Sequence, residues 1–141
     1  MKRTPLRRKS KSASALLKDK IQALVREIVM KRDGGCVLRE KRHCGAVLGL
    51  PGHVFQADHL ITRSNSATFA DTRLIVCVCK SCHAWKSLGG NMRKKQYDDL
   101  VKTVIPKERV ALWELAEENS WRATKVDWAL EEIALMQELN K

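Results

Sequence analysis

Apolar side chains recur at three- and four-residue intervals from about Ser14 to Arg32, with charged side chains between them. The apolar positions of this repeat are Leu17, Ile21, Leu24, Val25 and Ile28. Such spacing forms one apolar stripe and predicts an amphipathic helix over the segment. The run Asp33-Gly34-Gly35 follows and ends the helix, because glycine is common just beyond a helix C-terminus. We expect the stripe to pack into the core.

The middle of the chain, residues 36–90, has a different pattern and contains all five cysteines and all four histidines. Two short β-like runs lie in it, at 54–57 and 74–78, and a polar stretch at 62–72 separates them. The segment has little apolar material for its length, and small folds of this kind often need a bound metal. The pattern therefore predicts two strands beside a metal site.

The last third of the chain becomes helical in pattern again from about Arg93. Tyr97 and its apolar neighbours form one face of a first helix, and Pro106 begins a second. Thr124 opens a third, with Asp127 three positions on as an approximate capping box. The tryptophans of this region are expected to be core aromatics, because acidic surroundings disfavour stacking on nucleic-acid bases.

These patterns predict an α+β protein in three parts. Residues 1–12 are rich in Lys and Arg and contain no acid, which is typical of a disordered basic arm. Residues 13–92 are expected to hold the N-terminal helix and a small core that a metal stabilises. Residues 93–141 are expected to form a C-terminal helical subdomain.

The formal net charge is +11, and its distribution is uneven. Residues 1–95 contain 21 basic and 6 acidic side chains, whereas the remainder is acidic on balance. A one-sided positive field attracts a polyanion, most often nucleic acid, although a basic protein without such a partner has the same composition. In the basic arm, Arg7, Arg8 and Lys9 are the candidate DNA contacts.

Neither a membrane span nor a secretion signal is visible in the sequence. No apolar run approaches the roughly 20 residues that cross a bilayer. The basic start is not followed by the apolar segment of an export signal. We therefore expect a cytoplasmic protein, in which an odd number of cysteines favours metal binding or catalysis over a disulfide framework.

Four of the cysteines form two pairs. Cys79 and Cys82 make a C-x-x-C, which alone fits either a redox pair or half of a metal site. Cys36 and Cys44 supply the second pair, with seven residues between them, a wider spacing than the usual two to four. Four thiolates suit a tetrahedral zinc ion, and no βαβ pattern supports a thioredoxin-like site. We predict a structural Zn²⁺ at these four residues.

The fifth cysteine, Cys77, lies in the apolar run just before the C-x-x-C. We expect it to be buried in the core, where a free cysteine behaves as a small apolar residue. His43 is adjacent to Cys44 and could replace one cysteine as a metal ligand, while His53 follows a Pro-Gly pair in what reads as a loop. Neither histidine is expected to be catalytic.

Asp58 and His59 end the first predicted strand, and His83 directly follows the C-x-x-C. This order resembles the zinc-containing HNH nucleases, and the resemblance implies a ββα-metal core of treble-clef-like form. It further implies that His59 is the general base and that Asp58 and His83 bind a catalytic Mg²⁺ or Mn²⁺. The residue types suit the chemistry, because imidazole can accept a proton from water and a divalent ion can stabilise the leaving oxygen.

Two basic residues, Arg63 and Lys86, flank the proposed catalytic site. They could hold phosphate oxygens of DNA, and a solvated surface role fits them equally well. The HNH pattern also has a middle Asn that orients the base histidine, and Leu74 stands at that position here. Asp71 or Asn65 could take over the orienting role.

A broader resemblance covers nearly the whole chain after the basic arm, to the Rap/NinG recombination proteins of lambdoid phages. It is carried by the basic helix ending in Arg32-Asp33, the strand ending in Asp58-His59 and the segment from Cys79 to Lys86. The order of the C-terminal helices is also similar. This resemblance implies an endonuclease for branched DNA, such as Holliday junctions and D-loops, that acts in phage recombination in the cytoplasm of a bacterial host.

Two further expectations accompany this interpretation. A junction-cutting enzyme makes two cuts, which suggests a homodimer on functional grounds. The alternative function is a zinc-finger DNA-binding or recombination accessory protein without hydrolytic activity, and the missing middle Asn favours it. The Asp58-His59 pair favours the nuclease, because a purely structural finger does not require it.

Overall fold

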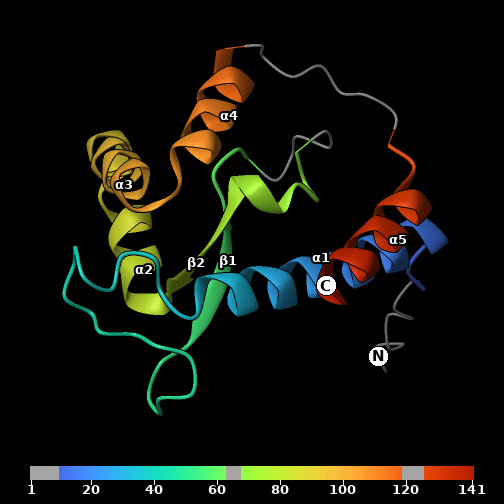
Figure 1. Ribbon diagram of the computed structural model, residues 1–141, viewed down its shortest axis with the longest axis horizontal. Helices are drawn as coiled ribbons and strands as arrows, with labels where there is room; N and C mark the ends of the chain where they lie inside the picture. The colour runs from blue at the N-terminus through green and yellow to red at the C-terminus, as the bar shows by residue number, and fades with distance from the viewer. Residues whose placement is uncertain (1–9, 63–67, 119–125) are drawn as a thin grey trace, which may run out of the picture.

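The computed structural model describes residues 10–62, 68–118 and 126–141 (Figure 1). Its elements are α1 (Ala13–Asp33), β1 (Phe55–His59), the short 3₁₀ helix η1 (Thr72–Leu74), β2 (Ile75–Cys79), α2 (Lys80–Leu88), α3 (Gly90–Val104), α4 (Lys107–Glu118) and α5 (Trp128–Leu139). This composition confirms the α+β class. Four candidate DNA contacts, namely Arg7, Arg8, Lys9 and Arg63, lie outside the described residues.

Helix α1 confirms the first predicted helix, extended by one residue at each end. The Ser12 hydroxyl accepts a hydrogen bond from the Ala15 N–H and caps the N-terminus. Gly34 ends the helix at φ 67°, a left-handed conformation that glycine adopts without steric cost, and its N–H donates to the Met30 carbonyl. The buried stripe of the helix consists of Ile21, Val25, Ile28 and Val29.

The two strands form one antiparallel pair, in which Asp58 lies opposite Val76 and His59 opposite Ile75. Every residue of β2 is buried. Helix α1 and helix α2 each contact both strands, so the sheet lies between them (Figure 1). Because helices cover both faces, β2 can be a continuous apolar run rather than an alternating one.

Side chains from α1 and α4 bind the outer edge of β2, the edge away from β1. The Ile75 carbonyl accepts hydrogen bonds from Arg32 at 2.7 Å and from Arg109 at 3.0 Å. The Cys77 N–H donates to the Asp33 carboxylate at 2.9 Å, and the Cys77 carbonyl accepts from the loop that follows α1. The Arg32-Asp33 pair therefore joins the end of α1 to the sheet and satisfies backbone groups that would otherwise be unpaired.

Helices α2, α3 and α4 follow β2 with short connections. The helical conformation is interrupted between α2 and α3, next to Gly90, which has φ 68°. Helix α3 therefore begins at Gly90, whereas the sequence pattern predicted a start at about Arg93. Pro106 precedes α4 as expected. Tyr97 of α3 and Trp113 of α4 are the largest fully buried side chains in the described residues. Trp113 is thus a core aromatic, as predicted.

Helix α5 packs along α1, on the opposite side of the molecule from α3 (Figure 1). Its N-cap is Asp127, whose carboxylate accepts from the N–H groups of Ala129 and Leu130. The expected capping box placed Thr124 at the cap and Asp127 inside the helix; Thr124 lies outside the described residues. Asp127 is the cap because its short carboxylate reaches two of the free N–H groups of the first turn.

The sequence predicted no membrane-spanning segment, and the helices of the structure bear on this prediction. Among residues 10–62, 68–118 and 126–141, no helix is both long enough and apolar enough to cross a bilayer. The longest of them, α1, carries charged side chains on its exposed faces. A helix of this kind packs one stripe inward and leaves the remaining faces to water.

Candidate metal centre and active site

The four predicted zinc ligands converge in the fold. The Sγ atoms of Cys36, Cys44, Cys79 and Cys82 all lie within 4.8 Å of one another. The first two come from the loop after α1, and the other two from the end of β2 and the first turn of α2. Three of the four cysteines are buried, and Cys44 is half-buried. His43, the alternative ligand, is exposed and is not part of this cluster.

A hairpin-like loop explains how Cys36 and Cys44 meet despite their wide spacing. Gly35 pairs with Val47 in an isolated antiparallel bridge, and the Cys36 N–H donates to the Ala46 carbonyl at 2.9 Å. Between the two cysteines the chain forms tight turns closed by backbone hydrogen bonds. The seven intervening residues are therefore folded compactly, and the two thiols face the same point.

The close approach at Gly35 leads to a testable prediction. A Cβ atom at this position would lie 2.5 Å from the Ala46 carbonyl oxygen and 2.9 Å from Val47 Cα, in a backbone at φ 150°. Gly35→Ala should therefore destabilise the protein by more than the roughly 1–3 kcal/mol of a strained residue alone. Chemical denaturation of the metal-loaded protein measures the difference.

Gly45→Ala is the matched control, because Gly45 also has a positive φ, 60°, but open space around its Cβ position. It should cost only the left-handed conformation, roughly 1–2 kcal/mol. Equal losses of stability in Gly35→Ala and Gly45→Ala would contradict the close approach of Gly35 to Ala46 and Val47.

The C-x-x-C pair lies at the start of α2, where backbone N–H groups point toward it. Cys79 is the N-cap of α2, and its sulfur accepts a hydrogen bond from the Cys82 N–H at 3.4 Å. The N-terminal end of a helix carries a partial positive charge, which stabilises thiolates. This position therefore prepares both sulfurs to act as metal ligands.

Shared protons within the cluster shift the thiol pKa values in opposite directions. A hydrogen bond from the Cys36 thiol lowers the pKa of Cys82 to about 5, and the same bond raises the pKa of Cys36. The shared proton therefore favours the thiolate form at Cys82. Four sulfur donors at this separation fit a soft divalent ion, so the cluster could hold a metal ion such as zinc.

Cys77 behaves differently from the other four cysteines. It is fully buried in β2, and burial raises the pKa of its thiol to about 12. It is not part of the four-cysteine cluster. These observations confirm the prediction that Cys77 is a core residue, where the protonated thiol packs as a small apolar group.

Arg42 is a neighbour of the cysteine cluster that sequence reasoning missed. A hydrogen bond from its guanidinium contributes to the low pKa of Cys82. The guanidinium also lies over the Trp85 ring, 4.1 Å from the centroid, and Arg93 approaches the same ring at 4.8 Å. A cation in this place offsets the negative charge of the thiolates. In the sequence, the only indication that Arg42 lies near the cluster is its position two residues before Cys44.

Asp58 and His83, the predicted ligands of a catalytic ion, lie next to each other. Asp58 is 8% exposed, and its Oδ1 is 3.7 Å from His83 Nε2. The same carboxylate accepts hydrogen bonds from Lys86 at 2.7 and 2.9 Å and from the Tyr97 hydroxyl at 2.5 Å. Lys86 therefore neutralises a buried carboxylate rather than extending freely into solvent.

Tyr97 is a second site residue that the sequence did not identify as one. Its position on the apolar face of α3 marked it only as a core residue, and it is indeed 1% exposed. Burial, and then the negative charge of Asp58, raise the pKa of its hydroxyl well above the ordinary value. The hydroxyl thus remains protonated and holds the Asp58 carboxylate in place as a hydrogen-bond donor.

His59, the predicted general base, lies against the loop before η1. Its Nε2 is 3.0 Å from the Phe69 carbonyl oxygen, and its ring stacks on that of Phe69 with centroids 5.6 Å apart. A carbonyl oxygen only accepts, so this hydrogen bond requires the proton on Nε2 and leaves the lone pair of the neutral ring on Nδ1. The Phe69 carbonyl therefore orients His59, which is the task of the middle Asn in the HNH pattern.

Of the two residues expected to replace that Asn, the structure describes only Asp71. The Asp71 carboxylate caps η1 and pairs with the Arg73 guanidinium at 2.8 and 2.9 Å. Asn65 lies outside the described residues. The printed contact of His59 is instead with the backbone carbonyl of Phe69, and a backbone carbonyl cannot be recognised as a functional group from residue types.

Strand geometry separates the predicted base from the predicted ligands. Consecutive residues of a strand point to opposite faces, so Asp58 and His59 leave β1 on different sides. Asp58 points toward α2 and α3, where Lys86 and Tyr97 bind it. His59 points toward Phe69 and borders a cavity of about 270 Å³ that α1 also lines. Asp58 and His83 are thus brought together, and His59 lies at the end of the same strand.

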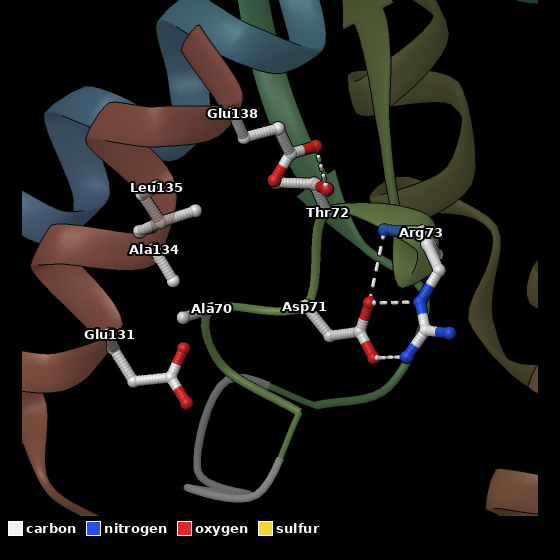
Figure 2. A pocket seen from close by; sticks show the side chains of 8 residues that line it. All are labelled: Ala70, Asp71, Thr72, Arg73, Glu131, Ala134, Leu135 and Glu138. Atoms are coloured by element: carbon white, nitrogen blue, oxygen red, sulfur yellow. Dashed lines mark hydrogen bonds and ion pairs between the residues drawn. The ribbon is translucent and has the colours of Figure 1, made fainter.

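A separate pocket of about 330 Å³ lies between η1 and α5 (Figure 2). It is lined by the Asp71–Arg73 ion pair and by Glu131 and Glu138 of α5. The Thr72 hydroxyl donates to Glu138 at 2.8 Å across the junction of the two elements. This contact attaches α5 to the loop that orients His59.

No family model, curated protein or solved structure matches this chain. The resemblance to the HNH nucleases and to the Rap/NinG proteins therefore rests on the residue motifs, and the activity that it implies stays a prediction. The geometry of the site provides the further arguments on function.

Proposed function

We propose that this protein is a metal-dependent DNA endonuclease with an HNH-type ββα-metal core. The observation that carries the proposal is the pair of Asp58 and His83, 3.7 Å apart, directly beside a four-cysteine cluster at the start of α2. A carboxylate and an imidazole are common ligands of a catalytic divalent ion. The order strand, strand, helix around them is that of the proposed core.

The proposed catalytic ion is Mg²⁺ or Mn²⁺, held by Asp58 and His83, and it would stabilise the leaving oxygen of the phosphodiester. Lys86 now supplies the positive charge at this carboxylate. A divalent cation at Asp58 would take over this charge balance, and the Lys86 ammonium could then contact a phosphate oxygen. The Tyr97 hydroxyl would fix the carboxylate through its hydrogen bond.

His59 supplies the proton acceptor in this proposal. With the proton held on Nε2 by the Phe69 carbonyl, the proton acceptor of the neutral ring would be Nδ1, a buried atom that the attacking water would have to reach. The ring is further fixed by its stacking on Phe69. The scissile phosphate would lie at the end of β1, because side chains from both faces of the strand could contact it there.

The proposed substrate is branched DNA, such as Holliday junctions and D-loops, processed during phage recombination by a homodimer. The net charge of +11 supports DNA as the partner. The preference for branches and the dimer come from the Rap/NinG resemblance and from the need for two cuts. The proposed place of action is the bacterial cytoplasm.

A second candidate function has one specific observation in its favour. The Asp58 carboxylate already has a full set of partners in Lys86, Tyr97 and His83. A buried ion pair of this kind can simply stabilise a fold whose role is to bind DNA. The protein would then be a zinc-dependent DNA-binding or recombination accessory protein without hydrolytic activity.

A nicking assay separates the two functions. Zinc-loaded protein is incubated with a four-way junction, or with linear duplex of the same sequence, in Mg²⁺, in Mn²⁺, or without either ion. The nuclease proposal expects cleavage only when a divalent ion is added, and faster cleavage of the junction. Binding of both DNAs without cleavage in any condition would overturn it in favour of the second candidate.

A further inference from the structure

A groove of about 570 Å³ lies between the end of α1, the loop after it, and the junction of α3 with α4. It is distinct from the site at Asp58 and His83, because none of the residues that line it belongs to that site. The apolar residues Val104 and Ile105 form part of its wall. We call it the basic groove, for the charges described next.

Four basic and two acidic side chains line the basic groove. One acid, Asp33, is already paired with Arg32 at 2.7 Å, and its side chain is 6% exposed. The second acid is Glu40, which is exposed. Once Arg32 is matched with Asp33, three cations face one carboxylate, and the groove keeps an excess of positive charge.

Two of the three remaining cations are fixed in place by carbonyl groups. Arg39 donates to the carbonyls of Asp33 and Cys36, and Arg109 donates to those of Arg73 and Ile75. Carbonyl acceptors position a guanidinium without cancelling its charge. Burial and the nearby charge of Arg32 lower the pKa of Arg109, as expected for a cation that lacks a full counter-charge. The third cation, Lys41, is exposed.

The N-terminal end of helix α4 also favours a negatively charged ligand in the basic groove. Pro106, which precedes α4, and Arg109, in its first turn, both line the groove. The first N–H groups of a helix have no partner within it, and the aligned peptide dipoles favour an anion there. Fixed guanidinium groups beside a helix N-terminus form a usual environment for phosphate.

We propose that the basic groove binds the phosphodiester backbone of DNA, at a position separate from the cleavage site. The proposal rests on the proposed function for the identity of the nucleic acid, but it does not depend on cleavage. It adds Arg39, Lys41 and Arg109 to the DNA contacts, none of which the sequence motifs identified. The pocket beside α5 has the opposite character, since three acidic side chains and one arginine line it.

Lys41→Ala tests the proposal, because Lys41 is exposed and its loss should not disturb the fold. Lys20→Ala is the matched control, an exposed lysine on α1 that does not line the groove. Binding of a labelled DNA duplex is measured by fluorescence anisotropy without added Mg²⁺ or Mn²⁺, between about 50 and 200 mM salt. Circular dichroism and zinc content establish that both variants are folded.

We expect Lys41→Ala to weaken duplex binding and to reduce the salt slope by about 1, the change for one lost phosphate contact. Lys20→Ala should leave the slope unchanged. Equal effects of the two substitutions would overturn the proposal, because they would report only the overall positive field. Tighter binding of oligoglutamate than of duplex with equal charge would also overturn it, since the groove would then recognise an acidic peptide. Because no cleavage is measured, an inactive protein can still pass this test.

Discussion

Replacing Cys82 with serine should abolish metal binding and unfold the centre of this protein. The residue belongs to a cluster of four thiols within 4.8 Å, and its own thiol has a pKa of about 5. Structural zinc contributes about 10–16 kcal/mol in small zinc-binding peptides. The free energy of unfolding of a whole small protein is only about 5–15 kcal/mol. Loss of the zinc contribution is therefore large enough to unfold the protein. We expect loss of the cooperative thermal transition, measured by circular dichroism.

Cys77→Ala is the matched control for this experiment. Cys77 is as buried as Cys82, but it is a core residue of β2 outside the cluster. Its replacement should keep one equivalent of zinc and cost about 1 kcal/mol, the scale for removing a small buried group. Lowering the pH should release the metal from the wild type, because the remaining thiols must be deprotonated to bind it. A Cys82→Ser protein that keeps both its zinc and its melting temperature would contradict the proposed metal centre.

His59→Ala should reduce cleavage of branched DNA by about 10²-fold or more, the usual scale for losing a general base. The ring is held by the Phe69 carbonyl and by stacking at the surface of the sheet, so the fold and DNA binding should survive. Cleavage is measured on the junction in Mg²⁺, and binding separately without it. Excess divalent ion should not rescue the variant, because a proton acceptor is missing rather than a ligand.

His83→Ala provides the contrasting result. It removes a proposed metal ligand whose side chain is about one-third exposed, so cleavage should be lost and partly regained with excess Mn²⁺. Asp58→Ala is less informative, because it leaves the Lys86 ammonium buried without its partner and should destabilise the fold by roughly 3–5 kcal/mol. His53→Ala, at an exposed position, is the neutral control. Wild-type cleavage rates in His59→Ala would remove His59 from the mechanism.

Much of the local structure could be predicted from the sequence. The repeat around Ile21 and Val25 gave α1, because a helix with one buried stripe leaves a clear period in the chain. The two β-like runs correspond to β1 and β2 within one or two residues. The cysteine cluster was also predictable, since four thiols have few roles other than a metal site in such a chain.

The contacts that complete the site could not be predicted in the same way. Tyr97 and Lys86 reach Asp58 from positions 39 and 28 residues away in the chain. A pairing across such distances depends on how α2 and α3 pack on the sheet, and no local pattern records it. The capping of α5 by Asp127 was missed for a different reason, because serine, threonine and aspartate are all good N-caps and their order alone does not select one.

Two copies of this chain cannot join their sheets through the outer edge of β2. An unpaired strand edge is the usual template for pairing with another chain, in dimers and in aggregates alike. Here Arg32 and Arg109 already bind the Ile75 carbonyl, and Asp33 already binds the Cys77 N–H. The residues that join α1 and α4 to the sheet therefore also block intermolecular strand pairing at this edge, and a homodimer would have to associate through other surfaces.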